Sequence, residues 1–255
     1  MRKSCLALLL TLCALFALTA SAEPLEQLPD LAGTVYWPEG TDAESAVYVY
    51  TYAYPQVAGE GEAVEAINKS FADLVADSLE FDVSRRGEEI ADTSAQSHTE
   101  ITYRVTANDG EFFSLLVFSD TTMEGQRFVS VKAQVFSLDT GKAGHQVTLP
   151  YLLGIIEDDS DDDWLRDRQT QRAEEIIRML ILDEIESRRA QGEAIPEEID
   201  EELLTYDFYP EEDFYYDEET GSVVFFLQPF LNGEGMAPDD FYTFAFDAEE
   251  ILDEM

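Results

Sequence analysis

The sequence predicts an α+β domain in which two main helices pack on a mainly antiparallel sheet. Three observations indicate this class. A strand-like segment leads into an amphipathic stretch, three strand-like segments separated by turn residues form a meander, and a long helical pattern precedes a C-terminal hairpin. The connections are short, and no internal repeat or linker divides them. We therefore expect a single domain over residues 45–255.

The predicted domain begins with a strand and a helix. Valine, threonine and alanine alternate with tyrosine over residues 47–54, which predicts a strand that ends at Pro55. From Glu62 onward the apolar spacing changes to that of an amphipathic helix. Its apolar stripe consists of Val64, Ile67, Phe71, Leu74, Val75 and Leu79. Residues 80–97 are polar and ambiguous.

A three-strand meander is predicted in the middle of the chain. Residues 99–107 alternate between apolar and polar side chains, and the Asn-Asp-Gly sequence at 108–110 is a strong turn signal. Residues 111–119 are apolar on both faces, as in a central strand that is covered on both sides. A polar turn at 120–125 leads into the third strand, residues 127–138.

The C-terminal half is predicted to contain the longest helix and the closing hairpin. Residues 163–190 carry apolar side chains at helical spacing, and Gly192 and Pro196 end this helix. A short acidic helix is expected within 197–204. Strand character then returns in the segments 213–217, 222–230 and 241–247, followed by a short acidic end.

Residues 1–22 are predicted to be a cleaved signal peptide. A basic start precedes an apolar run at 6–18, and the small residues at 20–22 match a cleavage site. This run is too short to span a bilayer as a helix, and no other run approaches that length. Residues 23–44 are rich in proline and acidic side chains and are predicted to be a leader. We expect a bacterial protein that is secreted or otherwise extracytoplasmic, without a membrane span.

The charge and the cysteines restrict the functions that are expected. The chain has 55 acidic and 15 basic residues, a formal net charge of −40. Binding of nucleic acid or of an anionic membrane surface needs basic side chains, so neither partner is expected. The same charge would attract a cationic protein. Both cysteines, Cys5 and Cys13, lie in the predicted signal peptide, so no disulfide or Cys-ligated metal is expected after cleavage.

The acidic stretch 157–163 is the densest group of possible metal ligands. Its spacing fails the calcium-loop pattern, because neither the glycine at the sixth position nor the glutamate at the twelfth is present. Ser160 and Asp163 instead fit the cap and the third position of the helix that follows. We interpret the stretch as a solvated helix start and predict no metal site. Weak cation binding and specific docking remain alternatives.

No catalytic residue and no cofactor are predicted. The two histidines, His98 and His145, lack a nucleophile elbow or a His-x-x-x-His pair, and no glycine-rich phosphate loop is present. With 55 carboxylates, some pair will lie at the separation found in glycosidases by chance. A secreted hydrolase of cell-wall glycan is therefore an alternative that requires a cleft with two buried carboxylates of opposed pKa shifts.

The tyrosine face of the first predicted strand is the candidate binding surface. It consists of Tyr48, Tyr50, Tyr52 and Tyr54. Aromatic surfaces bind sugars and proteins because they combine apolar area with a polar tip. The alternative is that these tyrosines pack under a helix.

Three parts of the chain carry a resemblance to a known family. They are residues 50–71, where a strand with Tyr-Pro precedes a helix with an Ile-Asn pair, residues 136–154 with the turn sequence Asp-Thr-Gly-Lys, and the hairpin sequences 214–230 and 241–251. Their order resembles the RsiV-like extracellular domain of unknown function. This domain forms the C-terminal part of lysozyme-sensing anti-sigma factors and accompanies some peptidoglycan deacetylases.

The resemblance implies a binding module with lysozyme or envelope glycan as its partner. The chain departs from the family at residues 125–127, which read Gly-Gln-Arg where many relatives carry a Gly-Ala-His element. It also shows no sigma-binding segment and no deacetylase zinc motif.

We therefore expect a non-enzymatic binding module of a bacterial cell envelope, which engages a cationic protein such as lysozyme or cell-wall glycan such as peptidoglycan. Besides the hydrolase, the remaining alternative is an acidic extracytoplasmic structural protein without a specific ligand.

Overall fold

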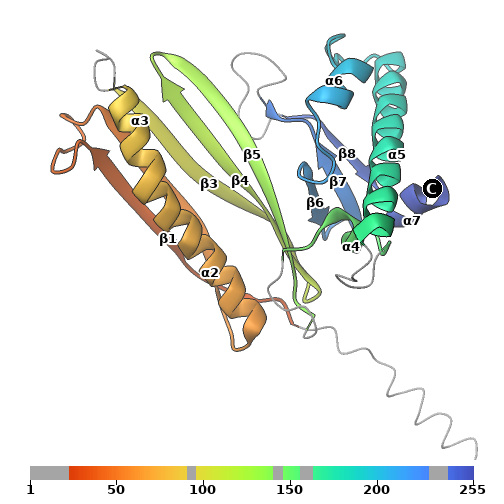
Figure 1. Cartoon of the computed structure of the whole chain (residues 1–255), viewed down its shortest axis with the longest axis horizontal. Helices are drawn as coiled ribbons and strands as arrows, with labels where there is room; N and C mark the ends of the chain where they lie inside the picture. Colours follow the sequence, from red (N-terminus) through yellow and green to blue (C-terminus); the bar gives the residue numbers. More distant parts are fainter. Residues whose placement is uncertain (1–22, 91–95, 140–145, 156–162, 230–240) are drawn as a thin grey trace, which may run out of the picture.

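The protein has four layers, two of helices and two of sheet (Figure 1). The structure is a computed structural model, and it describes residues 23–90, 96–139, 146–155, 163–229 and 241–255. The predicted signal peptide, His145 and all but the last residue of the acidic stretch lie outside the described residues. The α+β class and the mainly antiparallel pairing are confirmed.

The larger sheet has five strands in the order β1-β2-β3-β4-β5. They are β1 (Glu26–Trp37), β2 (Tyr48–Ala58), β3 (Ser97–Asn108), β4 (Phe112–Met123) and β5 (Gln126–Ser137). All neighbours pair antiparallel except β2 and β3, which are parallel. A parallel pair needs a crossover connection, and the helical segment between these strands provides it.

That crossover forms the first helical layer (Figure 1). It consists of α2 (Glu62–Asp77), the π-helical turn η1 (Ser78–Asp82) and α3 (Val83–Glu89). The predicted amphipathic helix is confirmed, since Val64, Ile67 and Phe71 are buried against the sheet. The ambiguous segment 80–97 contains the end of η1 and all of α3.

The predicted leader contains a strand, which corrects the prediction for residues 26–37. This strand, β1, is the edge of the larger sheet, and most of its first residues are exposed. Leu31, Val35 and Trp37 face the core at alternate positions. The proline and acidic residues obscured this alternation, and they suit an exposed edge where the strand is paired on one side only.

Strand β2 runs through Pro55 and ends at Ala58, so the prediction that it stops at Pro55 is wrong. The pairing with β1 shifts register here, between Leu28 and Leu31, and the pairing with β3 ends at Tyr52. Proline has no N–H to donate, and bulges and unpaired edges are the places in a sheet that accommodate it.

The predicted meander is confirmed as β3, β4 and β5. The β4–β5 turn is shorter than predicted and consists of Glu124 and Gly125, both with positive φ (53° and 82°), as two-residue hairpin turns require. Strand β4 is buried on both faces: Leu115 packs in the cluster under α2, whereas Leu116 packs toward the second sheet. This explains its continuous apolar sequence.

The C-terminal strands form a second sheet instead of extending the first. They are β6 (Phe214–Asp217), β7 (Ser222–Phe226) and β8 (Thr243–Phe246), in that order and antiparallel. Strand β7 is also covered on both sides: Val224 and Phe226 pack against β4 and β5, and Phe225 packs toward α5.

The second helical layer is dominated by α5 (Asp163–Ala190), whose predicted extent is confirmed. Ile177, Ile181 and Ile185 are completely buried between it and the second sheet. The shorter helices are α4 (Leu149–Leu152), α6 (Glu201–Tyr206) and α7 (Ala248–Asp253). Across the described ranges, no helix combines the length and the apolar character that membrane crossing requires.

Candidate functional site

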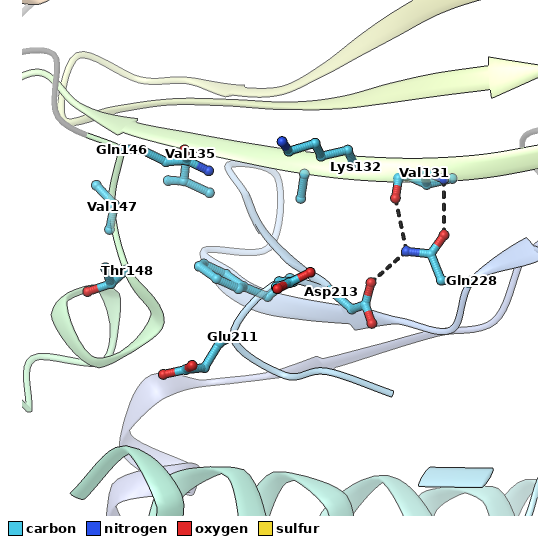
Figure 2. A pocket seen from close by; sticks show the side chains of 12 residues that line it. Val131, Lys132, Val135, Gln146, Val147, Thr148, Glu211, Asp213 and Gln228 are labelled. Atoms are coloured by element: carbon cyan, nitrogen blue, oxygen red, sulfur yellow. Dashed lines mark hydrogen bonds between the residues drawn. The ribbon is translucent and has the colours of Figure 1, made fainter. Parts of the chain in front are cut away.

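One candidate for a binding site is a cavity between β5 and the segment that leads into β6 (Figure 2). Its volume is about 660 Å³. The walls come from residues 131–133 and Val135 of β5, from residues 146–148, from residues 211–214 and from Gln228. The two sheets and the connection between β5 and α4 therefore meet around one space.

Gln228 joins the two sheets at one end of this cavity (Figure 2). Its side-chain oxygen accepts a hydrogen bond from the N–H of Val131 at 3.1 Å, and its Nε2 donates to the carbonyl of Val131 at 2.9 Å. Nε2 also donates to Oδ1 of Asp213 at 2.6 Å. The carboxamide thus takes the place of a neighbouring strand at one residue of β5.

Asp213 is the buried charge of the site, with 4% of its surface exposed. Its Oδ2 accepts a hydrogen bond from the N–H of Tyr209 at 3.0 Å, and its carbonyl accepts one from the N–H of Phe226 at 3.0 Å. Burial raises the pKa of Asp213 to about 6, although the hydrogen bonds from Tyr209 and Gln228 act to lower it. The carboxyl group therefore gains its charge close to neutral pH.

Further carboxylates extend the site toward α5. Glu211 and Glu212, directly before Asp213, are exposed at the cavity. A second cavity of about 510 Å³ shares Glu211 and Thr148 with the first, and Asp167 and Glu174 of α5 also line it. We call these five carboxylates, Asp167, Glu174, Glu211, Glu212 and Asp213, the acidic groove.

The acidic groove suits a cationic ligand. Its carboxylates accept hydrogen bonds from ammonium or guanidinium groups, and partial enclosure strengthens such pairs relative to those on an open surface. Glu174 is already paired with Arg178 at 2.9 Å. Lys132, a basic residue that lines the first cavity, lies along β5 and points away from Asp213 (Figure 2).

The predicted tyrosine surface lies elsewhere, on the other face of the five-stranded sheet under α2. Tyr48, Tyr50 and Tyr54 are at most 5% exposed, and Tyr52 is half-buried. Burial raises the pKa of all three covered tyrosines. This is the packed arrangement that the sequence left as the alternative, and it leaves no open aromatic surface at these three positions.

Specific contacts hold these tyrosines in the core. The hydroxyl of Tyr48 donates to Thr99 at 2.8 Å, and the ring of Tyr54 stacks on Phe71 with 5.8 Å between ring centroids. Their surroundings are those of structural residues.

Of the two histidines, His98 lies within the described residues. It is half-buried in β3 and lines neither cavity of the acidic groove. Within the described ranges, no group of His, Cys, Asp and Glu is arranged to hold a metal ion. Among the residues whose burial the structure describes, Asp213 is the single buried carboxylate, so these residues do not contain the pair of buried carboxylates that the hydrolase alternative requires.

Sequence reasoning missed Asp213 and Gln228. A signal for Gln228 was present, because it is the first polar side chain after the apolar run of β7. Asp213 gave no such signal, since it follows Glu211 and Glu212 and is one of 55 acidic residues.

Comparison with known proteins supports the fold. No protein-family model matches the chain, and no curated protein matches it. A DUF3298 family protein from Pseudomonas aeruginosa PAO1, known from its crystal structure, superposes with a TM-score of 0.53 at 10% identity, covering 92% of this chain and 95% of that one. A DUF3298 member from Bacteroides fragilis NCTC 9343 gives a TM-score of 0.49 at 10% identity, with 91% and 93% covered.

At this identity the likeness to the Pseudomonas protein concerns the architecture alone. This likeness agrees with the expectation that the fold is one also found in a family of domains of unknown function. Neither description mentions an RsiV-like domain, so that resemblance stays a prediction.

Proposed function

We propose that this chain is a non-enzymatic binding module that works outside the cytoplasmic membrane of a bacterium and engages a cationic protein. The observation that carries this proposal is the acidic groove, where Glu211, Glu212 and Asp213 line one side of a cavity of about 660 Å³. A preformed, partly enclosed space with convergent polar groups is the usual form of a binding site.

The net charge of the chain supports a cationic partner. With 55 acidic and 15 basic residues, the molecule carries an excess of negative charge that steers basic proteins toward it during diffusion. The sequence pattern of residues 1–22 supports export. The resemblance to RsiV-like domains suggests lysozyme as the first cationic protein to test.

Retention of lysozyme by the immobilised chain, residues 23–255, tests this proposal. We expect retention at low salt and weaker retention at physiological ionic strength, because salt screens the charges over a Debye length of about 8 Å. Peptidoglycan is the matched alternative ligand. The proposal would be contradicted if the chain retained lysozyme at neither salt concentration, or if it retained peptidoglycan and not lysozyme.

A further inference from the structure

The free edge of β5 offers a second feature beside the acidic groove. β5 is the last strand of its sheet, and its pairing with β4 runs without a register shift from Gln126 to Ser137. Val131 uses both its N–H and its C=O outward, toward Gln228. Because the outward backbone groups of an antiparallel edge strand recur at every second residue, those of Ala133 and Val135 point outward as well.

Val131 is paired through both of its outward groups and Val135 through its carbonyl. Gln228 takes both groups of Val131, and the carbonyl of Val135 accepts a hydrogen bond from the N–H of Val147 at 2.7 Å. Ala133 lies between them and lines the cavity. In the described parts of the chain, no hydrogen bond reaches the outward N–H or C=O of Ala133. Polar backbone groups inside a protein are normally paired, and the described residues offer no partner to this position.

The chemistry of the missing partner follows from Gln228. To hydrogen-bond with both the outward N–H and the outward C=O of an edge residue, a group must present an acceptor and a donor on the same side. The primary carboxamide of Gln228 does this at Val131. One residue of an extended peptide does the same with its own N–H and C=O. The acetamido group of a cell-wall sugar is a trans secondary amide, whose N–H and C=O point in opposite directions. It could satisfy only one of the two groups, so the geometry favours a peptide over glycan.

The register also determines where the side chain of such a residue lies. Residues directly opposite each other in a sheet carry their side chains on the same face. The methyl group of Ala133 packs in the cluster formed with Tyr215 and Phe226 of the second sheet. The side chain of the docked residue therefore points to that face, where Glu212 and Asp213 line the cavity. Lys132 does not oppose it, because alternate side chains of a strand point to opposite faces.

We propose that the β5 edge at Ala133 binds one Lys or Arg residue of a basic protein segment through two backbone hydrogen bonds, with the side chain of that residue directed to Glu211, Glu212 and Asp213. The segment is extended at this residue and turns away from β5 on both sides of it, because Gln228 and Val147 occupy the neighbouring positions. This inference rests on the proposed function, since it takes the partner to be a cationic protein, and it adds the point of attachment. The cavity that Ala133 lines, of about 660 Å³, is large enough for one amino-acid residue.

Binding of a short labelled peptide tests the inference. The probe is fluorescein-labelled Gly-Gly-Lys-Gly-Gly with blocked ends, measured by fluorescence anisotropy at low salt. Its glycines let the chain turn away from β5 on both sides of the lysine. One matched peptide is methylated on the backbone nitrogen of its lysine, which removes the donor to Ala133 and keeps the charge. A second has glutamate in place of lysine. We expect the N-methylated peptide to bind about tenfold more weakly, the loss typical of one hydrogen bond, and the glutamate peptide not to bind.

Two protein variants give the reciprocal test. Ala133→Pro removes the outward N–H and should weaken the unmethylated peptide to the level of the methylated one. Val129→Pro is the matched control, because it alters an outward position of the same edge that does not line the cavity. It should leave peptide affinity unchanged. If Ala133→Pro does not fold, as judged by circular dichroism, the comparison of the methylated and unmethylated peptides decides the matter.

The outcomes separate this inference from the proposed function. Equal affinity for the methylated and unmethylated peptides overturns the attachment at Ala133. So does the absence of peptide binding by a chain that retains lysozyme in a salt-sensitive manner, and in that case the proposed function stands. If neither lysozyme nor the peptide is bound, both proposals are wrong.

Discussion

Gln228 pairs with the backbone of Val131 as a neighbouring strand would, with hydrogen bonds of 3.1 and 2.9 Å, and so fastens the second sheet to the free edge of the first. The same carboxamide donates to Asp213 at 2.6 Å. One side chain therefore holds the buried carboxylate of the acidic groove and shapes the end of its cavity. This arrangement leads to predictions about stability, pH dependence and binding.

Replacing Gln228 with leucine should destabilise the protein. Gln228→Leu leaves the N–H and C=O of Val131 and one oxygen of Asp213 without their partners. We expect a loss of about 2 to 4 kcal/mol in the free energy of unfolding, measured with urea, because buried unpaired polar groups are costly. Gln126→Leu is the control, since Gln126 is exposed at the start of β5, and it should change stability little. A similar loss in both variants would be inconsistent with the bridging role.

Asp213→Asn should change the pH dependence of stability. The pKa of Asp213 is about 6 in the folded protein and 3.8 in its ordinary state, so the unfolded chain ionises first as pH rises. The stability linked to the raised pKa is present below the lower value and is lost as pH rises through the higher one. The other acidic residues are common to both proteins, so the comparison isolates Asp213.

Between about pH 5 and pH 7, the wild type should therefore lose on the order of 1 to 3 kcal/mol of unfolding free energy relative to Asp213→Asn. Urea titrations of both proteins across this range provide the measurement. A difference that does not change with pH would show that Asp213 is not held in the uncharged form near pH 5.

Gly87→Ala should destabilise the contact between α3 and β1. A Cβ atom at Gly87 would lie 2.3 Å from Cδ2 of Trp37, so the helix and the edge strand would have to separate. We expect a loss of about 1 to 3 kcal/mol, as for other overpacked cores, although alanine has the higher helix propensity. Thermal unfolding of the single variants and of Gly87→Ala with Trp37→Leu checks this. The smaller side chain at position 37 should recover part of the loss, and strictly additive effects would refute the steric explanation.

Tyr48→Phe should affect stability and not binding. It removes the hydroxyl that donates to Thr99 in the buried network under α2, which should cost about 1 kcal/mol. Tyr206→Phe provides the comparison, because the side chain of Tyr206 is 68% exposed. Retention of lysozyme by Tyr48→Phe should equal that of the wild type. Weaker retention by a variant that remains folded would return the tyrosine face to consideration as a binding surface.

Local sequence patterns predicted the elements well where a single amphipathic or turn signal dominated. The helix over residues 163–190 and the meander are examples, since Ile177, Ile181 and the Asn-Asp-Gly turn act locally. Strand β1 was missed because an edge strand pairs on one side and tolerates prolines and charges that interrupt its alternation. The division into two sheets was missed because a strand that is buried on both faces has the same continuous apolar sequence whichever sheet it belongs to.

The candidate site could not be predicted because its parts are distant in sequence. Val131 lies in β5, Asp213 precedes β6 and Gln228 follows β7, and the three residues meet only when the two sheets pack together. The burial that raises the pKa of Asp213 is likewise a property of the assembled layers. The alternating tyrosines, by contrast, are easily seen in the sequence. Aromatic residues build cores as well as binding surfaces, so this pattern alone does not tell the two apart.

The central claim is that the acidic groove, more than the overall charge, holds the cationic partner. The most direct test compares lysozyme retention by Glu211→Gln/Glu212→Gln with retention by Glu44→Gln/Glu88→Gln, which removes the same number of exposed charges away from the groove. The claim predicts that the groove variant loses most of its retention at physiological ionic strength, while the control behaves like the wild type. Equal retention by both variants would contradict it.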